Sequence, residues 1–141
     1  MTALAADRAT PRYTDKVMHD YPMKASTKGY AGALAVLNGG WLAPGTTATG
    51  LIAVGVFDKY ADNSAGANGD INGRVKSGIY RFNNSASSDL IAMTEVGSDC
   101  YIVDDNTVAK TNGSSTRSVA GKVVNVDAQG VWVAVGPGNV L

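Results

Sequence analysis

Residues 30–57 read YAGALAVLNGGWLAPGTTATGLIAVGVF and carry the clearest strand and turn signals in the chain. Residues 30–37 are mostly apolar and are followed by Asn38-Gly39-Gly40, which predicts a hairpin because Asn-Gly accepts positive φ at both turn positions. Residues 51–57 form a continuous apolar run, as expected of a strand that is covered on both faces. Periodicity alone leaves a short buried helix open, but Gly50 and Gly55 favour a strand.

A change of pattern marks the strand predicted at residues 74–82. Val75 lies between two basic residues, whereas Arg81 lies between two aromatic residues, so the buried side of the strand changes midway. One extra residue would produce this change, and we therefore predict a β-bulge at Ser77-Gly78.

Short apolar segments separated by Gly-, Asn- and Ser-rich turns continue to the end of the chain. Residues 58–73 predict a long polar loop, and residues 87–92 predict a single helical turn that ends before Gly97. Further strands are predicted at residues 101–103, 107–109, 119–126 and 131–135, the last two joined by the four-residue connection 127–130. Many short strands at this spacing predict an all-β fold, a small β-barrel or sandwich.

The glycines divide the chain into an arm and a body. All 17 lie from Gly29 onward, so we predict an extended N-terminal arm at residues 1–25 and a β-barrel or sandwich body at residues 26–141. Pro11 and Pro22 limit the arm to a short helix, which is marginal in water. We expect the arm to become ordered against a partner. Its predicted contact residues are Arg12, Tyr13, Val17, Met18, Tyr21 and Met23. For residues 17–24, a first strand of the body is an equally open alternative.

Composition narrows the class of protein. The 141 residues suit one domain, and 12 basic and 12 acidic side chains give a formal net charge of zero, without the basic excess that direct nucleic-acid binding requires. The apolar runs are too short to span a bilayer, so we expect no membrane contact. Asp7 and Arg8 interrupt the N-terminal residues before an apolar stretch typical of a signal peptide develops, so we expect synthesis in the cytoplasm. The single cysteine, Cys100, lies in an apolar string and is predicted to be a buried, inert thiol.

No arrangement of residues points to catalysis, a metal or a cofactor. Any nucleophilic triad would need His19, the only histidine, and His19 lies in the predicted arm. One His and one Cys cannot complete a zinc site. Residues 68–73 echo a calcium loop but begin with Asn, and Ile79 stands where a bidentate Glu is required. Asp104-Asp105, with Asp99 nearby, would attract a cation or, more simply, form a turn before Asn106.

The two tryptophans are candidate contact residues. Trp41 follows the predicted hairpin turn and is the more exposed candidate, either for a sugar-stacking platform or for an oligomer interface. Trp132 lies between two valines, which favours the core or a subunit interface.

Several strings together resemble the head decoration, or capsid cement, proteins of tailed bacteriophages. Besides residues 30–57, they are RFNNSASSDL (81–90), VGSDCYIVDDNTVAKTNG (96–113), AGKVVNVDAQGVWVAV (120–135) and, in the arm, DRATPRYTDKV (7–17). The resemblance implies a homotrimer on the outer surface of the virion head. There it would clamp adjacent capsomers of the major capsid protein at three-fold sites, after synthesis in the bacterial host cytoplasm. It carries over no catalytic residue.

Two other classes remain open beside this one. A carbohydrate- or host-surface-binding β-module would use Trp41 and loop aromatics as stacking platforms. Another phage structural subunit, such as a tail-tube protein, would polymerise by itself into rings or tubes. An enzyme is the weakest of the alternatives because it would depend on His19.

Overall fold

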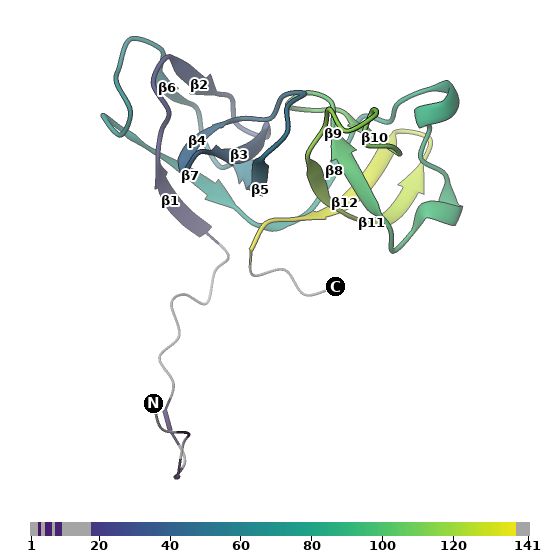
Figure 1. Ribbon diagram of the computed structural model, residues 1–141, viewed down its shortest axis with the longest axis horizontal. Helices are drawn as coiled ribbons and strands as arrows, with labels where there is room; N and C mark the ends of the chain where they lie inside the picture. The colour runs from purple at the N-terminus through teal and green to yellow at the C-terminus, as the bar shows by residue number, and fades with distance from the viewer. Residues whose placement is uncertain (1–2, 4, 7, 10–17, 138–141) are drawn as a thin grey trace.

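The protein is all-β. The computed structural model describes residues 3, 5–6, 8–9 and 18–137, and its strands form two five-stranded antiparallel sheets and one two-stranded sheet (Figure 1). The first sheet has the spatial order β1 (Met18–Pro22), β7 (Asn72–Lys76), β5 (Leu51–Phe57), β3 (Leu34–Asn38), β4 (Trp41–Pro44). The second has the order β10 (Val108–Ala109), β9 (Asp99–Ile102), β11 (Val119–Asp127), β12 (Gly130–Val135), β8 (Gly78–Phe82).

The remaining elements are short. The two-stranded sheet pairs β2 (Thr27–Gly29) with β6 (Ala61–Asn63). Two single-turn 3-10 helices, η1 (Ser87–Asp89) and η2 (Met93–Glu95), lie between β8 and β9. Within the described residues, no helix is long and apolar enough to cross a membrane.

The predicted hairpin is confirmed, with its turn one residue further along the chain than Asn38-Gly39. Asn38 is the last residue of β3 and pairs with Trp41 of β4. Gly39 and Gly40 are the two central residues, and both have positive φ (59° and 88°), as a two-residue turn of this hand requires.

The first sheet buries side chains on both of its faces, as the apolar run 51–57 predicts. Val56 of β5 joins a large cluster shared with the second sheet, whereas Val54 and Phe57 join a cluster on the opposite face. The register of β5 against β3 shifts beside Gly55, which has a φ of +142°. If any other residue stood there, its Cβ would lie only 2.3 Å from the carbonyl oxygen of Lys76. Only glycine fits that position, so β5 changes parity there and feeds both clusters.

The change of parity in residues 74–82 has a different cause from the predicted β-bulge. The chain leaves the first sheet at Lys76, the end of β7, and enters the second sheet at Gly78, the start of β8. Ser77 between them is 1% exposed, and its hydroxyl lies 2.8 Å from the carbonyl oxygen of Pro137 and 3.3 Å from that of Val54. The bulge prediction is therefore wrong: the segment is two strands of two sheets.

Each five-stranded sheet curls so that its edge strands meet at one end. Met23, just after β1, forms a bridge with Leu42 of β4, and Asn83, just after β8, forms a bridge with Thr107 before β10. These single bridges join the edges without closing a barrel, so the body is best described as sandwich-like. They also cover part of each exposed edge.

Three local predictions need correction. The polar loop 58–73 contains the strand β6, which pairs with β2. The connection 127–130 is a two-residue loop because Asp127 and Gly130 already pair with each other. The single helical turn is the 3-10 helix η1, followed by the second short helix η2.

The predicted arm ends earlier than residue 25. Met18–Pro22 pairs with β7 over its whole length, and Met23 is fully buried in the second cluster, which it shares with Phe57. These residues belong to the body because their alternate side chains fill a core, so the alternative of a first strand is the correct one. The predicted contact residues Arg12, Tyr13 and Val17 lie outside the described residues.

We predict that replacing Phe57 by alanine lowers the free energy of unfolding by about 3–5 kcal/mol, because its ring fills the space left by the missing side chain of Gly29. Urea unfolding of Phe57→Ala measures the loss. The control Ile71→Ala, at a side chain that is 38% exposed, should cost less than about 1 kcal/mol. Equal losses for the two variants would contradict the assigned core.

Candidate functional site

The strongest candidate for an interaction surface is the segment between β8 and β9. Leu90, Met93 and Val96 are 49%, 61% and 43% exposed, and they follow one another at intervals of three residues around η1 and η2. Large apolar side chains gathered on one short segment are typical of a binding surface. We call these three side chains the 90–96 ridge.

Asn84 fixes the orientation of the ridge. Its amide nitrogen donates to the carbonyl oxygen of Ile91 (2.8 Å), and its amide oxygen accepts from the backbone N–H of Ile91 (2.9 Å). Ile91 is 1% exposed and packs in the large cluster. Because Ile91 is held inward, its neighbour Leu90 is held outward.

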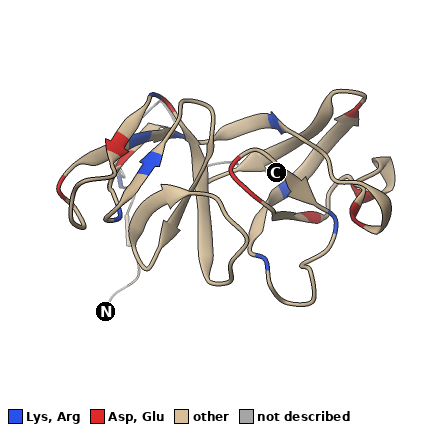
Figure 2. Cartoon of the chain, turned by 90° about the horizontal axis from the view of Figure 1, so that it is seen from above, with Lys and Arg blue, Asp and Glu red and all other residues tan. Residues whose placement is uncertain are grey.

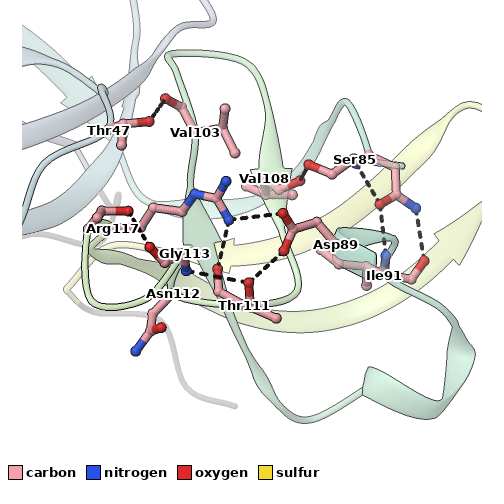
Figure 3. Close-up of polar contacts among 12 residues, drawn as sticks. Thr47, Ser85, Asp89, Ile91, Val103, Val108, Thr111, Asn112, Gly113 and Arg117 are labelled. Carbon is pink, nitrogen blue, oxygen red and sulfur yellow. Dashed lines mark hydrogen bonds and ion pairs between the residues drawn. The ribbon is translucent and has the colours of Figure 1, made fainter. Parts of the chain in front are cut away.

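A polar network fastens the base of the ridge to the loop before β11. Asp89 accepts hydrogen bonds from the hydroxyl of Thr111 and from Nη1 of Arg117 (3.3 Å), and Arg117 also donates to the carbonyl oxygen of Thr111 (3.1 Å; Figure 3). The backbone N–H of Lys110 donates to the carbonyl oxygen of Asp89 (2.9 Å). The hydrogen bond from Thr111, and then Arg117, lower the pKa of Asp89 below its ordinary value.

A second carboxylate holds the other end of the ridge. Glu95 accepts from the hydroxyl of Thr94 and from the backbone N–H of Ala92 (3.1 Å), and it lies 3.9 Å from the ammonium group of Lys110. These contacts, led by the hydrogen bond from Thr94, lower the pKa of Glu95. A carboxyl with a depressed pKa stabilises the fold above its ordinary pKa and loses that effect as pH falls through the depressed value, so the ridge is held in place at neutral pH.

A hollow between the two five-stranded sheets is a second candidate surface. It measures about 370 Å³ and lies beside Ile52 and Val119, which are 61% and 41% exposed. Asp99 and Lys122 form an ion pair at its border, with 2.8 Å between Oδ1 and Nζ. The hollow therefore offers an apolar wall with a polar rim, as protein interfaces do.

The two tryptophans are both half-buried within the chain. Trp132 lies on the outer face of β12, where its Nε1 donates to Oδ2 of Asp127 (2.9 Å) and the guanidinium of Arg81 lies 5.7 Å from the ring centroid. Trp132 is thus not a core residue, and its role at a subunit interface stays a prediction. Trp41 also stays a candidate interface residue, but part of its ring packs against Gly69 of the same chain: a Cβ added at Gly69 would lie 3.1 Å from the ring.

The residues considered for chemistry are scattered. Cys100 is buried, and burial, with a smaller effect of Asp99, raises its pKa to about 12, so the predicted inert thiol is confirmed. His19 lies on β1, with its ring 5.9 Å from that of Tyr21. Asp104 accepts the backbone N–H of Asn106 (2.9 Å), which confirms the predicted turn. Within the residues that the structure describes, no three His, Cys, Asp or Glu side chains gather to hold a metal ion.

The contact residues predicted in the arm are divided among different environments. Met18 is 36% exposed at the start of β1, and Tyr21 packs partly against the second cluster. Met23 is fully buried, so its prediction as a contact residue is wrong. The buried amide of Asn63, in β6, donates to the carbonyl oxygens of Lys24 and Ala67 (3.0 Å each) and so joins the chain after β1 to the loop before β7.

Sequence reasoning missed the 90–96 ridge. The signal was the three-residue spacing of Leu90, Met93 and Val96 in a segment that otherwise holds Ile91 and small or polar residues, and the short 3-10 turns place these three side chains on the surface. Basic and acidic residues are interspersed through the body in Figure 2. Exposed apolar side chains therefore distinguish the 90–96 ridge from the rest of the surface better than charge does.

Comparison of the chain with protein-family models, with curated protein sequences and with solved structures finds no match. A functional proposal therefore depends on the 90–96 ridge, on the hollow beside Ile52 and Val119, and on the resemblance of the sequence to phage decoration proteins.

We predict that Asn84→Ala loosens the ridge without unfolding the body. Both backbone groups of Ile91 lose a partner, which costs about 1–3 kcal/mol locally, so amide hydrogen exchange in residues 87–96 should accelerate by one to two orders of magnitude. The matched control is Ser88→Ala, at an exposed position in the same segment. Unchanged exchange in Asn84→Ala would show that Asn84 does not hold the ridge.

Proposed function

We propose that this protein is a structural virion protein: a cement, or decoration, protein that trimerises on the outer surface of a tailed-phage head. It clamps adjacent capsomers of the major capsid protein at three-fold sites and stabilises the shell against the pressure of the packaged DNA. The 90–96 ridge is the observation that carries the proposal, because it presents large apolar side chains in fixed positions on a rigid β-body.

The ridge and the hollow supply the two kinds of surface that the proposed role needs. One surface must join copies of the chain, and another must meet the shell. We assign the hollow beside Ile52 and Val119 to contacts between copies, together with Trp41 and Trp132 as candidate interface residues, and the ridge to the shell. Burying apolar area contributes about 2.5 kcal/mol per 100 Å² before the cost of ordering is subtracted.

The N-terminal residues add a second attachment. Residues 1–17 precede the edge strand β1, and Arg12, Tyr13 and Val17 are the contact residues proposed in them, followed by the half-exposed Met18. Three arms on one trimer bind with a high effective concentration, so moderate affinity of each arm gives tight attachment of the whole. Attachment should require the expanded shell, where the spacing of the capsomers creates the site.

The zero net charge of the chain fits a surface layer that does not bind the genome.

Co-sedimentation with expanded capsids tests the proposal. The capsids are assembled from the major capsid protein encoded in the same genome. Two variants are compared with the wild type: a deletion of residues 1–16, which leaves β1 and Met23 in place, and Leu90→Ser/Met93→Ser. Each should remain a folded trimer, as we expect of the full-length 14.5 kDa chain, and bind at least about tenfold more weakly than the wild type. The control Ile71→Ser, at an exposed apolar residue outside the ridge, should bind like the wild type.

Three outcomes would contradict the proposal. Wild-type occupancy in both variants would show that neither the N-terminal residues nor the ridge attach the protein. Rings or tubes of the purified chain under the electron microscope would favour the tail-tube alternative. A monomeric mass would contradict the trimer.

A further inference from the structure

Two tyrosines form an exposed aromatic pair on the surface that carries the two-stranded sheet. Tyr30 and Tyr60 are 56% and 49% exposed, and their ring centroids lie 5.3 Å apart with an interplanar angle of 30°. Gly29, the last residue of β2, pairs with Ala61, the first residue of β6; Tyr30 directly follows Gly29 and Tyr60 directly precedes Ala61. The strand pairing therefore fixes the spacing of the two rings.

The tyrosine pair has charged neighbours on the same strands. The ammonium group of Lys28 lies 5.8 Å from the ring centroid of Tyr30, and the hydroxyl of Tyr60 donates to Oδ2 of Asp62 (3.1 Å). Lys28 and Asp62 are themselves cross-strand partners. These contacts orient the tyrosine side chains while leaving about half of each exposed, and ordered tyrosines lose little entropy on binding.

A hollow of about 320 Å³ opens beside Tyr30. It is lined by Tyr30, Ala31, Gly32, Ala33, Asp105 and Asn106. The backbone N–H of Ala33 donates to the carbonyl oxygen of Tyr30 (3.0 Å), and Gly32 has φ +88°, so residues 30–33 form a tight turn. Nothing lies within 4 Å of the place where a Cβ of Gly32 would be, which keeps this wall of the hollow open.

The opposite wall carries polar groups held by a second loop. The backbone N–H of Leu34 donates to the carbonyl oxygen of Asp105 (2.7 Å), which fixes that loop against the turn. The side-chain oxygen of Asn106 accepts from the hydroxyl of Thr107 (3.1 Å). Among the contacts of the described residues, neither the carboxylate of Asp105 nor the amide nitrogen of Asn106 has a hydrogen-bond partner. The hollow thus offers one strong acceptor and one donor beside an aromatic ring.

We propose that this hollow, together with Tyr30 and Tyr60, is a binding site for a neutral sugar. A pyranose ring has an apolar C–H face, which packs on an aromatic ring, and hydroxyl groups, each of which both donates and accepts. Asp105 and Asn106 supply the complementary acceptor and donor. The volume fits one sugar unit, with Tyr60 extending the platform to the next.

Charge selects against other ligands that stack on aromatic rings. Asp62 beside Tyr60 is the cross-strand partner of Lys28, so these two charges offset each other. Asp104 and Asp105 lie in the loop that forms the polar wall of the hollow, so a phosphate group or an acidic sugar that entered it would meet repulsion. A purely apolar peptide would bury the carboxylate of Asp105 without a partner, which is costly. A neutral sugar avoids both penalties.

Nuclear magnetic resonance titration of the purified full chain tests the proposal. The probes are the neutral trisaccharides chitotriose, maltotriose and cellotriose and, for comparison, sialyllactose and a proline-rich peptide, each at up to about 10 mM. At least one neutral trisaccharide should shift the signals of Tyr30, Gly32 and Asn106 with a Kd of about 1 mM. Tyr30→Ala and Asp105→Ala should each weaken that binding at least about tenfold, and Ile79→Ala, at an exposed position on β8 outside the site, should leave it unchanged.

The contrary results are equally specific. No shift with any neutral trisaccharide, or equal affinity in Tyr30→Ala, would overturn the sugar site. Binding of sialyllactose or of the proline-rich peptide in preference to the neutral sugars would assign the tyrosine pair to another ligand and would also overturn it.

Discussion

The burial of the first sheet on both faces is the constraint on which the rest of the structure depends. β3 and β5 have neither a polar face nor an exposed one over most of their length, so the chain must supply two layers to cover them. One layer is the second sheet, and the other comes from Met23 and the residues around β2 and β6. Gly55 makes the arrangement possible because it lets β5 direct side chains to both clusters.

The surfaces follow from this arrangement. The second sheet needs only its inner face for the shared core, so the segment between β8 and β9 is left to carry Leu90, Met93 and Val96 outward. The same packing against the first sheet holds Tyr30 and Tyr60 on its far layer. Backbone and side-chain hydrogen bonds fix both groups before any partner arrives, which lowers the entropic cost of binding. A rigid body with prearranged contact residues suits attachment to a large assembly.

Local patterns in the sequence predicted local structure well. The hairpin signal at Asn38-Gly39-Gly40 and the apolar run 51–57 depend on neighbouring residues. The structure confirms the hairpin, with its turn shifted by one residue, and a strand that is buried on both faces over most of its length, Ile52 being exposed. The parity change at residues 74–82 was detected, but its cause was not, because a bulge and a passage between sheets leave the same alternation. The sequence left β1 open as an alternative and did not reveal β6. Both strands are short, and each is stabilised by a strand distant in the sequence: β1 pairs with β7, and β6 pairs with β2.

The candidate contact residues were harder to predict than the fold. Trp132 lies between two valines as a core residue would, yet strand alternation places it on the opposite face from them, beside Arg81. The exposure of Leu90 depends on Asn84 holding Ile91 inward, a side-chain contact that neither composition nor strand alternation reveals. Tyr30 and Tyr60 are 30 residues apart and meet only because β2 pairs with β6.

The proposed role in a phage head is tested most directly by a cryo-electron microscopy reconstruction of the virion encoded by the same genome. The expected result is density for this two-sheet body outside the shell at the three-fold junctions, three copies at each, with Leu90, Met93 and Val96 against the major capsid protein. Density for the same body in the tail tube, or a complete head that lacks it, would contradict the proposal.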